Sequence, residues 1–310
     1  MVNPAFTGLY KGWERLTVNH KSQWLNANTK FFTTALAVDF NLLKTPKNKG
    51  AFLGIGLQMY NDVGGDSKFG TKQIFSTIST IVPIAGDQVL ALGFQAGMGQ
   101  KSGSYENLIF SNQFDGNVFD PAINPQETNG LNSKIYPDLS VGFLYQYGGI
   151  HQRYRKSEDI VFNIGVSVYH FNTPTIYYNF GSFEELNKKL TLHSLFKRDF
   201  SRSYVGFEML ANHFRQGPHT ETLLAALLRY KKSSGSQVTR LRKKVVLAMG
   251  MAYRVGDAVA PVFRIENGDW SFGMSYDITI SKLGTYRRGG GLEFSLVYNN
   301  TNFALFKRRY

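Results

Sequence analysis

Apolar residues alternate with small or polar residues along most of the chain. The clearest run places Trp270, Phe272, Met274, Tyr276, Ile278 and Ile280 between Ser271, Gly273, Ser275, Asp277 and Thr279. Successive side chains of a β-strand point to opposite faces, so a period of two indicates a strand with one apolar face. Because this period recurs throughout and convincing helical periodicity is confined to short stretches, we predict an all-β protein.

The alternation divides into about fourteen predicted antiparallel strands. They cover residues 14–24, 31–43, 50–60, 73–84, 88–100, 138–147, 160–171, 188–199, 203–214, 220–230, 244–254, 257–265, 268–280 and 290–299. An even number of strands brings both ends of the chain to the same side of a closed barrel. We therefore expect residues 1–310 to form one barrel domain, with a basic tail at residues 300–310.

The two faces of these strands separate a membrane barrel from a soluble sandwich. One face is apolar, with aromatic residues near the strand ends, and the other carries mostly Gly, Ser, Ala, Thr, Asn and Gln. A soluble sandwich exposes a polar face that is usually rich in charged residues. A transmembrane outer-membrane β-barrel instead turns its apolar face to lipid and keeps a polar interior. We favour the membrane barrel, with the sandwich as the alternative.

The longest predicted connection, residues 101–137, lies on the side away from the chain ends. Two shorter connections, residues 61–72 and 172–187, lie on the same side, which faces outward in bacterial barrels. The long connection contains Phe110, Phe114 and Phe119 among polar residues. A long loop that exposes aromatic residues is typical of partner binding. Folding back into the lumen as a plug is the alternative interpretation.

The excess positive charge gathers on the opposite, periplasmic side. The chain has 35 Lys and Arg against 22 Asp and Glu, a formal net charge of +13. Residues 44–49, 149–159, 231–244 and 300–310 account for the whole excess, so the rest of the chain is neutral. The candidate residues of this basic face are Lys44, Arg153, Arg155, Lys231, Lys232, Arg240, Arg242 and Lys243. They contact anionic lipid headgroups or dock an acidic periplasmic partner, and both interpretations stay open.

No residue pattern indicates catalysis or a cofactor. The absence of cysteine excludes disulfides, thiolate metal sites and cysteine nucleophiles, and no apolar run is long enough for a membrane helix. The six histidines lack helical zinc-site spacing, and residues 65–72 end in a reversed Thr-Lys pair unlike a phosphate-binding loop. No nucleophile elbow occurs, and the basic segments lack interleaved aromatic residues. We expect no enzyme, no cofactor, no metal and no nucleic-acid partner.

Several short motifs resemble those of one family. They are Asn3-Pro4-Ala5-Phe6-Thr7-Gly8, His20-Lys21-Ser22-Gln23-Trp24, YPDLSVG at 136–142, IGVSVYHFN at 164–172 with Pro174, GMSYDITISKL at 273–283 and GGLEFSLVY at 290–298. Each motif alone carries little information, but the set and its order cover nearly the whole chain. The sequence is similar to the PorP/SprF family, outer-membrane proteins of the type IX secretion system in Bacteroidota.

The resemblance implies a role in secretion or in anchoring at the cell surface, without catalysis. The implied partners are secreted proteins with a type IX C-terminal signal domain, including gliding-motility adhesins. Periplasmic secretion-system lipoproteins or peptidoglycan-associated proteins are further implied partners. The alternative function is an outer-membrane channel for small solutes or fatty acids, because fourteen strands enclose a lumen. Family members usually carry a leader that is not visible here, so we expect a processed or trimmed chain.

Two local expectations follow from the motifs. The segment from Asn3 to Gly8 is predicted to form a turn that leads into the first strand. Asp277 and Glu293 fall on the polar face of neighbouring strands, where Arg264 is the candidate ion-pair partner of one of them.

Overall fold

The computed structural model describes most of the 310-residue chain. The described residues are 2–24, 30–44, 50–106, 108–127, 130–149, 159–179, 181–200, 203–233, 245–281 and 290–301.

Within these residues the chain is built almost entirely from strands. They are β1 (Glu14–Gln23), β2 (Phe31–Leu42), β3 (Phe52–Gly64), β4 (Phe69–Pro83), β5 (Gln88–Ser102), β6 (Tyr136–Tyr147), β7 (Asp159–Tyr169), β8 (Thr175–Tyr177), β9 (Phe183–Glu185), β10 (Lys189–Asp199), β11 (Val205–Gln216), β12 (His219–Ser233), β13 (Val245–Arg254), β14 (Ala258–Asn267), β15 (Trp270–Thr279) and β16 (Gly290–Asn300). The helical elements are two single 3-10 turns, η1 (Pro4–Phe6) and η2 (Ser111–Gln113). In the described part of the chain, no helix has the length and apolar character needed to cross a membrane.

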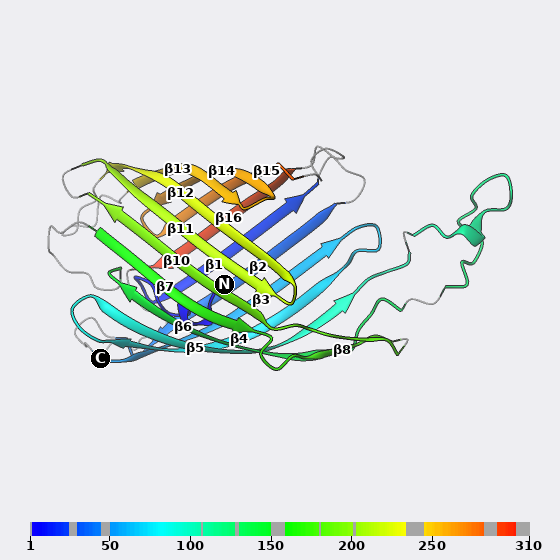
Figure 1. Ribbon diagram of the computed structural model, residues 1–310, viewed down its shortest axis with the longest axis horizontal. Helices are drawn as coiled ribbons and strands as arrows, with labels where there is room; N and C mark the ends of the chain where they lie inside the picture. Colours follow the sequence, from blue (N-terminus) through cyan, green and yellow to red (C-terminus); the bar gives the residue numbers. More distant parts are fainter. Residues whose placement is uncertain are drawn as a thin grey trace.

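Fourteen of the strands form one closed antiparallel barrel (Figure 1). The order around the wall is β1, β16, β15, β14, β13, β12, β11, β10, β7, β6, β5, β4, β3 and β2. The first and last strands close the ring, with Glu14 opposite Asn300 and Gln23 opposite Gly291. This confirms the fourteen predicted barrel strands, and the described structure adds the short hairpin β8–β9 outside the wall.

The predicted outer loop at residues 61–72 is wrong in its extent. β3 extends to Gly64 and β4 already begins at Phe69, so only a tight turn separates the two strands. Asn61 and Asp62 look like loop residues, but Asp62 faces the lumen, where its Oδ1 accepts a hydrogen bond from Thr33 Oγ1 at 2.5 Å. A polar interior therefore lets strands extend through polar sequence that normally signals a loop.

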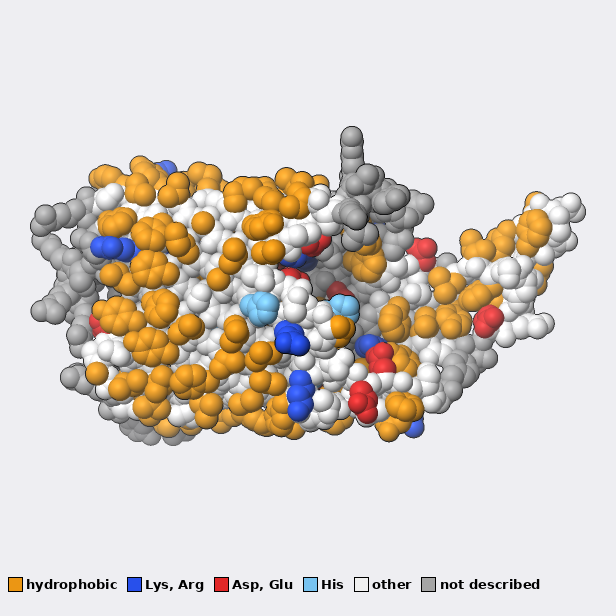
Figure 2. Space-filling view, viewed as in Figure 1, with side chains coloured by type: hydrophobic (Ala, Val, Ile, Leu, Met, Phe, Trp, Pro, Cys, Tyr) orange, Lys and Arg blue, Asp and Glu red, His pale blue; other side chains and the backbone are white. Residues whose placement is uncertain are grey.

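The outer surface of the barrel is apolar, as the alternation predicts. On β5 the outward side chains Leu92, Phe94 and Met98 are 57%, 43% and 58% exposed, while Gly93 and Gln95 face inward and are buried. In Figure 2 apolar side chains cover most of the visible face of the barrel. An isolated soluble barrel would expose this whole belt to water, so the belt marks a membrane-spanning barrel.

The two ends of the barrel differ. At the loop end, the β5–β6 connection and the hairpin β8–β9 extend beyond the wall on one side (Figure 1). At the opposite turn end, β4 joins β5 and β14 joins β15 through short connections. Trp270 and Tyr298 lie tilted against each other at the turn end with ring centroids 4.6 Å apart, and on the outward face toward the loop end Phe32 stacks on His20. Aromatic residues at both edges of the apolar belt are typical of membrane barrels.

Candidate functional site

The lumen is occupied by the chain segment that precedes β1, here called the N-terminal plug (residues 2–13; Figure 1). The buried hydrophobic cluster of the protein lies between this plug and β3–β6. It consists of Ala5, Leu9, Phe52, Ile81, Val89, Ala91 and Leu144, with Phe6 packed against it. The core of the molecule is therefore inside the barrel, where a channel would have its pore.

The Asn3–Gly8 motif shapes the plug locally. Asn3 caps η1, because its Oδ1 accepts a hydrogen bond from the Ala5 amide at 2.8 Å, and Pro4 occupies the start of the turn. Gly8 follows with φ +74°, a left-handed conformation that favours glycine. The prediction of a turn that leads into β1 is correct, and the structure adds that this turn is buried in the lumen.

Inward-facing glycines provide the seat for this turn. They lie at Gly54 on β3, Gly93 on β5 and Gly142 on β6. A Cβ atom on these glycines would come within 2.4 Å of Thr7 O, 2.4 Å of Ala5 N and 1.9 Å of Asn3 Oδ1, respectively. Such distances are far below van der Waals contact, so the plug backbone lies directly against the wall only because these side chains are absent.

Hydrogen bonds then fix the plug to several strands. Asn3 Nδ2 donates to the carbonyl oxygens of Phe143 on β6 and Val166 on β7, both at 3.0 Å. Ser79 on β4 donates to the carbonyl oxygen of Thr7 at 2.5 Å. These contacts satisfy polar groups of an irregular segment that is otherwise buried.

Asp39 on β2 holds the other end of the plug. Its side chain is fully buried and receives two hydrogen bonds from the Arg15 guanidinium, at 2.9 and 2.8 Å, and one from the Gly8 amide at 2.8 Å. Arg15 Nη2 also donates to the Phe6 carbonyl at 3.0 Å. A buried bidentate ion pair thereby joins β1, β2 and the plug in one unit.

The predicted basic face is described only in part. Lys44 donates from Nζ to the Tyr10 carbonyl at 2.8 Å, and burial lowers the pKa of its ammonium to about 8. Lys231 donates to the Phe200 carbonyl, while Lys232 is exposed. Lys44 and Lys231 therefore make internal contacts at the turn end. The other candidates, Arg153, Arg155, Arg240, Arg242 and Lys243, lie outside the described residues.

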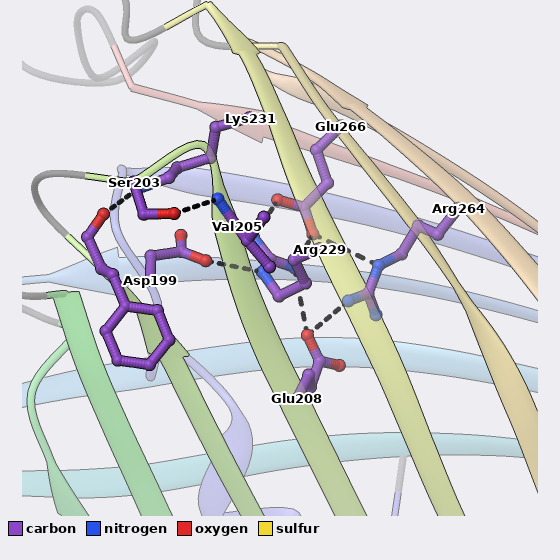
Figure 3. Close-up of polar contacts among 9 residues, drawn as sticks. Asp199, Ser203, Val205, Glu208, Arg229, Lys231, Arg264 and Glu266 are labelled. Atoms are coloured by element: carbon purple, nitrogen blue, oxygen red, sulfur yellow. Dashed lines mark hydrogen bonds and ion pairs between the residues drawn. The ribbon is translucent and has the colours of Figure 1, made fainter.

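The opposite lumen wall carries a buried charge network around Arg229 of β12 (Figure 3). Arg229 Nε lies 2.9 Å from Asp199 Oδ1, Nη1 lies 3.1 Å from Glu208 Oε2, and both terminal nitrogens bind Glu266 at 2.8 and 2.9 Å. Arg264 bridges Glu208 and Glu266 at 2.5 and 3.2 Å. These side chains connect β10, β11, β12 and β14 across the inside of the wall.

The expected partner of Arg264 is therefore wrong. Asp277 is paired instead with Lys21 of β1 at 2.8 Å and with Arg254 of β13 at 3.2 Å. Arg264 is inward-facing as expected, but it lies nearer the turn end, where Glu208 is the nearer acid. A cavity of about 270 Å³ lies between these two charge clusters and is lined largely by small and aliphatic side chains of β11–β14.

The long β5–β6 connection does not enter the lumen, so the plug interpretation of this loop is wrong. Figure 1 shows it extending away from the barrel mouth, and the plug comes from the N-terminal segment instead. We call residues 103–106, 108–127 and 130–135 together with the hairpin residues 175–179 and 181–185 the outer platform. Figure 2 shows apolar side chains along its projecting arm.

The base of the outer platform is a small extension of β structure. Ser133 forms a bridge with Tyr178, and the Lys134 amide donates to the Tyr177 carbonyl at 2.7 Å. Lys101 pairs with Glu184, which also accepts from Tyr178 Oη at 3.0 Å. Partial burial and this carboxylate raise the pKa of Tyr178 to about 12. Tyr177 and Phe183 of the hairpin remain 52% and 65% exposed.

The tip of the platform has local structure of its own. Phe114 and Phe119 pair in a β-bridge, and Asp115 Oδ1 accepts hydrogen bonds from the amides of Asn117 and Val118, both at 2.8 Å. These amides lower the pKa of the Asp115 carboxyl.

The three predicted phenylalanines differ in exposure. Phe114 is 56% exposed, whereas Phe110 packs against Tyr105 with ring centroids 5.5 Å apart and Phe119 is half-buried. Ile109 and Val118, which the aromatic pattern missed, are 72% and 61% exposed.

Within the described residues, no group of three or more His, Asp or Glu side chains is placed to hold a metal ion. His170 Nδ1 lies 2.7 Å from Asp138 Oδ2, and His213 Nδ1 lies 2.9 Å from Thr222 Oγ1. Both histidines therefore make hydrogen-bonding contacts with a residue on a neighbouring strand.

Sequence reasoning missed the plug and its seat. One signal was present: Gly54, Gly93 and Gly142 occupy inward positions of three strands in the same half of the barrel. Glycine residues at the same level of neighbouring strands indicate that another backbone segment lies against them. A lumen that is empty or filled by side chains does not require them. Only the strand register, which the alternation leaves open, shows that these glycines border one segment.

A closed strand wall with an apolar outer belt and a lumen filled by its own chain defines a membrane-spanning, internally plugged β-barrel. A family model described as "Type IX secretion system membrane protein PorP/SprF" matches residues 1–298. The chain therefore belongs to the PorP/SprF family of type IX secretion system membrane proteins, which confirms the resemblance seen in its motifs.

Solved structures of other barrels are similar at low identity. The ΔS2S3 mutant of the monoaromatic hydrocarbon channel TodX, a Pseudomonas putida protein, is 8% identical with a TM-score of 0.48, covering 95% of this chain and 91% of its own. BamA from Haemophilus ducreyi lacking POTRA domains 1–3 is 10% identical with a TM-score of 0.46, covering 93% and 70%. The translocator domain of NalP from Neisseria meningitidis is 10% identical with a TM-score of 0.37, covering 94% and 89%. A search of curated proteins finds no match.

Proposed function

We propose that this protein is a non-enzymatic outer-membrane component of the type IX secretion system that binds or anchors an exported protein at the cell surface. In this orientation the loop end faces outward and the turn end faces the periplasm. The observation that carries the proposal is the outer platform, a one-sided projection that exposes Ile109, Phe114 and Val118 at its tip. Apolar side chains displayed this far from the wall are typical of a protein-binding surface.

The hairpin extends this surface toward the barrel. Phe183 and Tyr177 lie with ring centroids 6.1 Å apart, and both are more than half exposed. Aromatic anchors at the centre of an interface commonly supply much of its binding energy. The proposed occupant is a secreted protein with a type IX C-terminal signal domain, as in adhesion or gliding motility in Bacteroidota.

Co-purification with the detergent-solubilised barrel tests this function. The variant F114S/V118S/F183S should lose the exported partner, because three apolar anchors become polar while the strand wall is unchanged. The matched control is L92S/M98S/L228S, which alters three equally exposed side chains on the lipid face. Retention of the partner by the platform variant, with the folded barrel intact, would contradict platform binding.

The plug counts against the alternative of a channel for small solutes or fatty acids. An uninterrupted polar lumen is expected to conduct ions, whereas this lumen contains the buried plug and its hydrophobic cluster. In planar bilayers we expect the intact protein to show no steady single-channel conductance. Stable conductance together with an intact plug would favour the channel.

The periplasmic basic face remains a second docking hypothesis. Of its described members, Lys232 is exposed, while Lys44 and Lys231 already bond to backbone carbonyls. Charge reversal of Lys232, Arg240, Arg242 and Lys243 should release a periplasmic lipoprotein or peptidoglycan-associated partner. Lys68→Glu, at the loop end, is the control. Unchanged co-purification of every periplasmic protein would leave only lipid headgroups as the role of this face.

A further inference from the structure

A basic patch interrupts the barrel surface where the apolar belt ends at the loop end of β10–β12. In Figure 2 the apolar belt gives way, toward the mouth that carries the long arm, to a band with basic, histidine and acidic side chains. By register, Leu190 of β10 lies beside Arg215 of β11, which lies beside Thr220 of β12. In the next outward row Leu192, His213 and Thr222 are neighbours.

The outward face of this patch carries no acid. Lys188, directly before β10, continues the alternation of Leu190 and Leu192, and both Lys188 and Arg215 are exposed. In the described structure neither cation has a carboxylate within ion-pair distance. Glu221, the acid closest to Arg215 on β12, faces inward toward Arg254 at 3.5 Å. Glu185, the nearest acid to Lys188 along the chain, forms no ion pair with either cation among the described residues.

Leucine side chains surround the cations on this face, while His213 lies directly below Arg215. Leu190, Leu192 and Leu224 are 38%, 46% and 44% exposed on the same outward face. The two unpaired cations lie nearer the loop end, and the exposed leucines continue toward the middle of the barrel. The surface can therefore bind a charged headgroup at the loop end and acyl chains beside the leucines. Thr220 of β12 adds a neutral hydroxyl group beside Arg215, while the Thr222 hydroxyl bonds to His213. This arrangement matches a lipid whose anionic headgroup also carries hydroxyls.

We infer that Lys188 and Arg215 bind the phosphate of a phosphorylated glycolipid in the outer leaflet, with its acyl chains against Leu190, Leu192 and Leu224. Arg215 supplies a planar fork for phosphate oxygens, and Lys188 supplies a second point charge. Because this site needs the loop end in the outer leaflet, it rests on the orientation in the proposed function. It does not depend on the secreted partner.

Another basic position near the loop end has different neighbours. On the β3–β5 side, Lys72 of β4 is also outward and exposed, but its strand neighbours are Asn61 and Gln100. No second cation lies beside it in these rows. Lys72 therefore gives a matched control with the same orientation and a similar position near the loop end.

Native mass spectrometry of the detergent-solubilised full chain tests the site, with diphosphoryl lipid A, its dephosphorylated form and phosphatidylglycerol as probes. We expect a diphosphoryl lipid A complex whose affinity falls about tenfold or more in K188Q/R215Q and is unchanged in K72Q. The unaltered protein should bind dephosphorylated lipid A as weakly as K188Q/R215Q binds diphosphoryl lipid A. Heat-modifiable gel mobility should show both variants folded, since the changed side chains are exposed.

Equal binding of diphosphoryl lipid A by K188Q/R215Q and the unaltered protein would overturn the inference. Equal binding of the dephosphorylated form would overturn the role of phosphate. Phosphatidylglycerol binding as tight as that of lipid A would overturn the commitment to a glycolipid. Loss of lipid A binding with full retention of the secreted partner would support this site and leave the proposed function standing separately.

Discussion

The two halves of the lumen wall fill the same space by opposite means. Along β3–β6 the inward positions include Gly54, Gly93 and Gly142, and the space beside them is taken by the backbone of the N-terminal plug. On the opposite wall the plug reaches β10, where Phe6 packs against His193, and beyond this contact Arg229 of β12 with its carboxylate partners extends into the lumen.

The difference shows that an inward position has no fixed chemistry in a barrel. Strand alternation decides which residues face the lumen, but what occupies the lumen decides their size. Glycine occurs where the backbone of the plug lies against the wall. Long charged side chains occur where side chains of neighbouring strands form ion pairs with one another in the lumen. Replacing residues on each wall tests whether the two halves are as independent as this implies.

The largest effect is expected for Arg229→Met. The substitution leaves Asp199, Glu208 and Glu266 close together without the guanidinium that joins them. Breaking a buried ion network in this way costs about 3–5 kcal/mol. The midpoint temperature of unfolding, followed by heat-modifiable gel mobility, should fall sharply. Arg215→Met, an exposed and unpaired arginine on the neighbouring strand, is the control and should change little.

The next effect is expected for Gly93→Val, on the glycine-lined wall. The new side chain would overlap the Pro4–Ala5 backbone, because even a Cβ lies 2.4 Å from Ala5 N. Overpacking of this kind costs about 1–3 kcal/mol and should displace the plug while the strand network remains. Single-channel conductance should then appear where the unaltered protein shows none.

Ala96→Val is the matched control for Gly93→Val. Ala96 is on the same strand but faces the lipid side, so the added carbons do not reach the plug. Conductance in both variants, or in neither, would show that the glycine seat does not hold the plug closed.

A smaller effect is expected for Asp39→Asn. The amide keeps the shape of the side chain, but it is neutral and offers one acceptor oxygen where the carboxylate offers two, so at least one hydrogen bond from Arg15 or Gly8 is lost. The loss should be about 1–2 kcal/mol, and it should be felt by the plug and by Arg15 of β1. Amide hydrogen exchange at residues 5–10 should quicken, while exchange in β12 stays the same. Asp62→Asn, which changes an acid on β3 away from the plug, serves as the control. Faster exchange of residues 5–10 in this control as well would refute the role of Asp39 in holding the plug.

The smallest effect concerns pH and the outer platform. Although partial burial opposes it, the hydrogen bonds from Lys101 and Tyr178 keep the pKa of Glu184 below the usual 4.5. The contacts of the Glu184 carboxylate with Lys101 and Tyr178 are therefore fully present above about pH 4.5. They are lost as the pH falls through the folded-state pKa of Glu184.

Because the chain has no native cysteine, labels at N117C and S182C can report the geometry of the platform. The spin-label distance distribution should be narrow at pH 7 and broaden below pH 4.5. Glu184→Gln should broaden it at both values, whereas Glu106→Gln should follow the unaltered protein. A distribution that ignores pH in every variant would contradict the role of Glu184.

The strand wall was predictable because alternation is a local property. The run from Trp270 to Thr279 shows its lipid face and its lumen face directly in the sequence. Strand ends were harder. The continuation of β3 through Asn61 and Asp62 depends on a polar interior, which removes the usual link between polar residues and loops.

The site was less predictable, because its contacts join residues far apart in the chain. Asn3 bonds to Phe143 and Val166, separations of 140 and 163 residues. The motif around Asn3 was visible, but its partners were not. The same reason explains Arg264, whose partner Glu208 lies three strands away along the chain and reaches it across the lumen side of β12 and β13.

The plug also constrains the order in which the barrel is assembled. It is joined directly to β1, yet beyond β1 its residues 3–9 contact β2 to β7 and β10, whereas the ring closes only when β16 reaches β1. Contacts this distant in sequence form slowly. We expect the plug to settle while the sheet is curved but still open, because after closure it would have to thread into the lumen. Closing of the β1–β16 seam then encloses a lumen that is already filled. A chain whose plug arrives late would close as an empty ring.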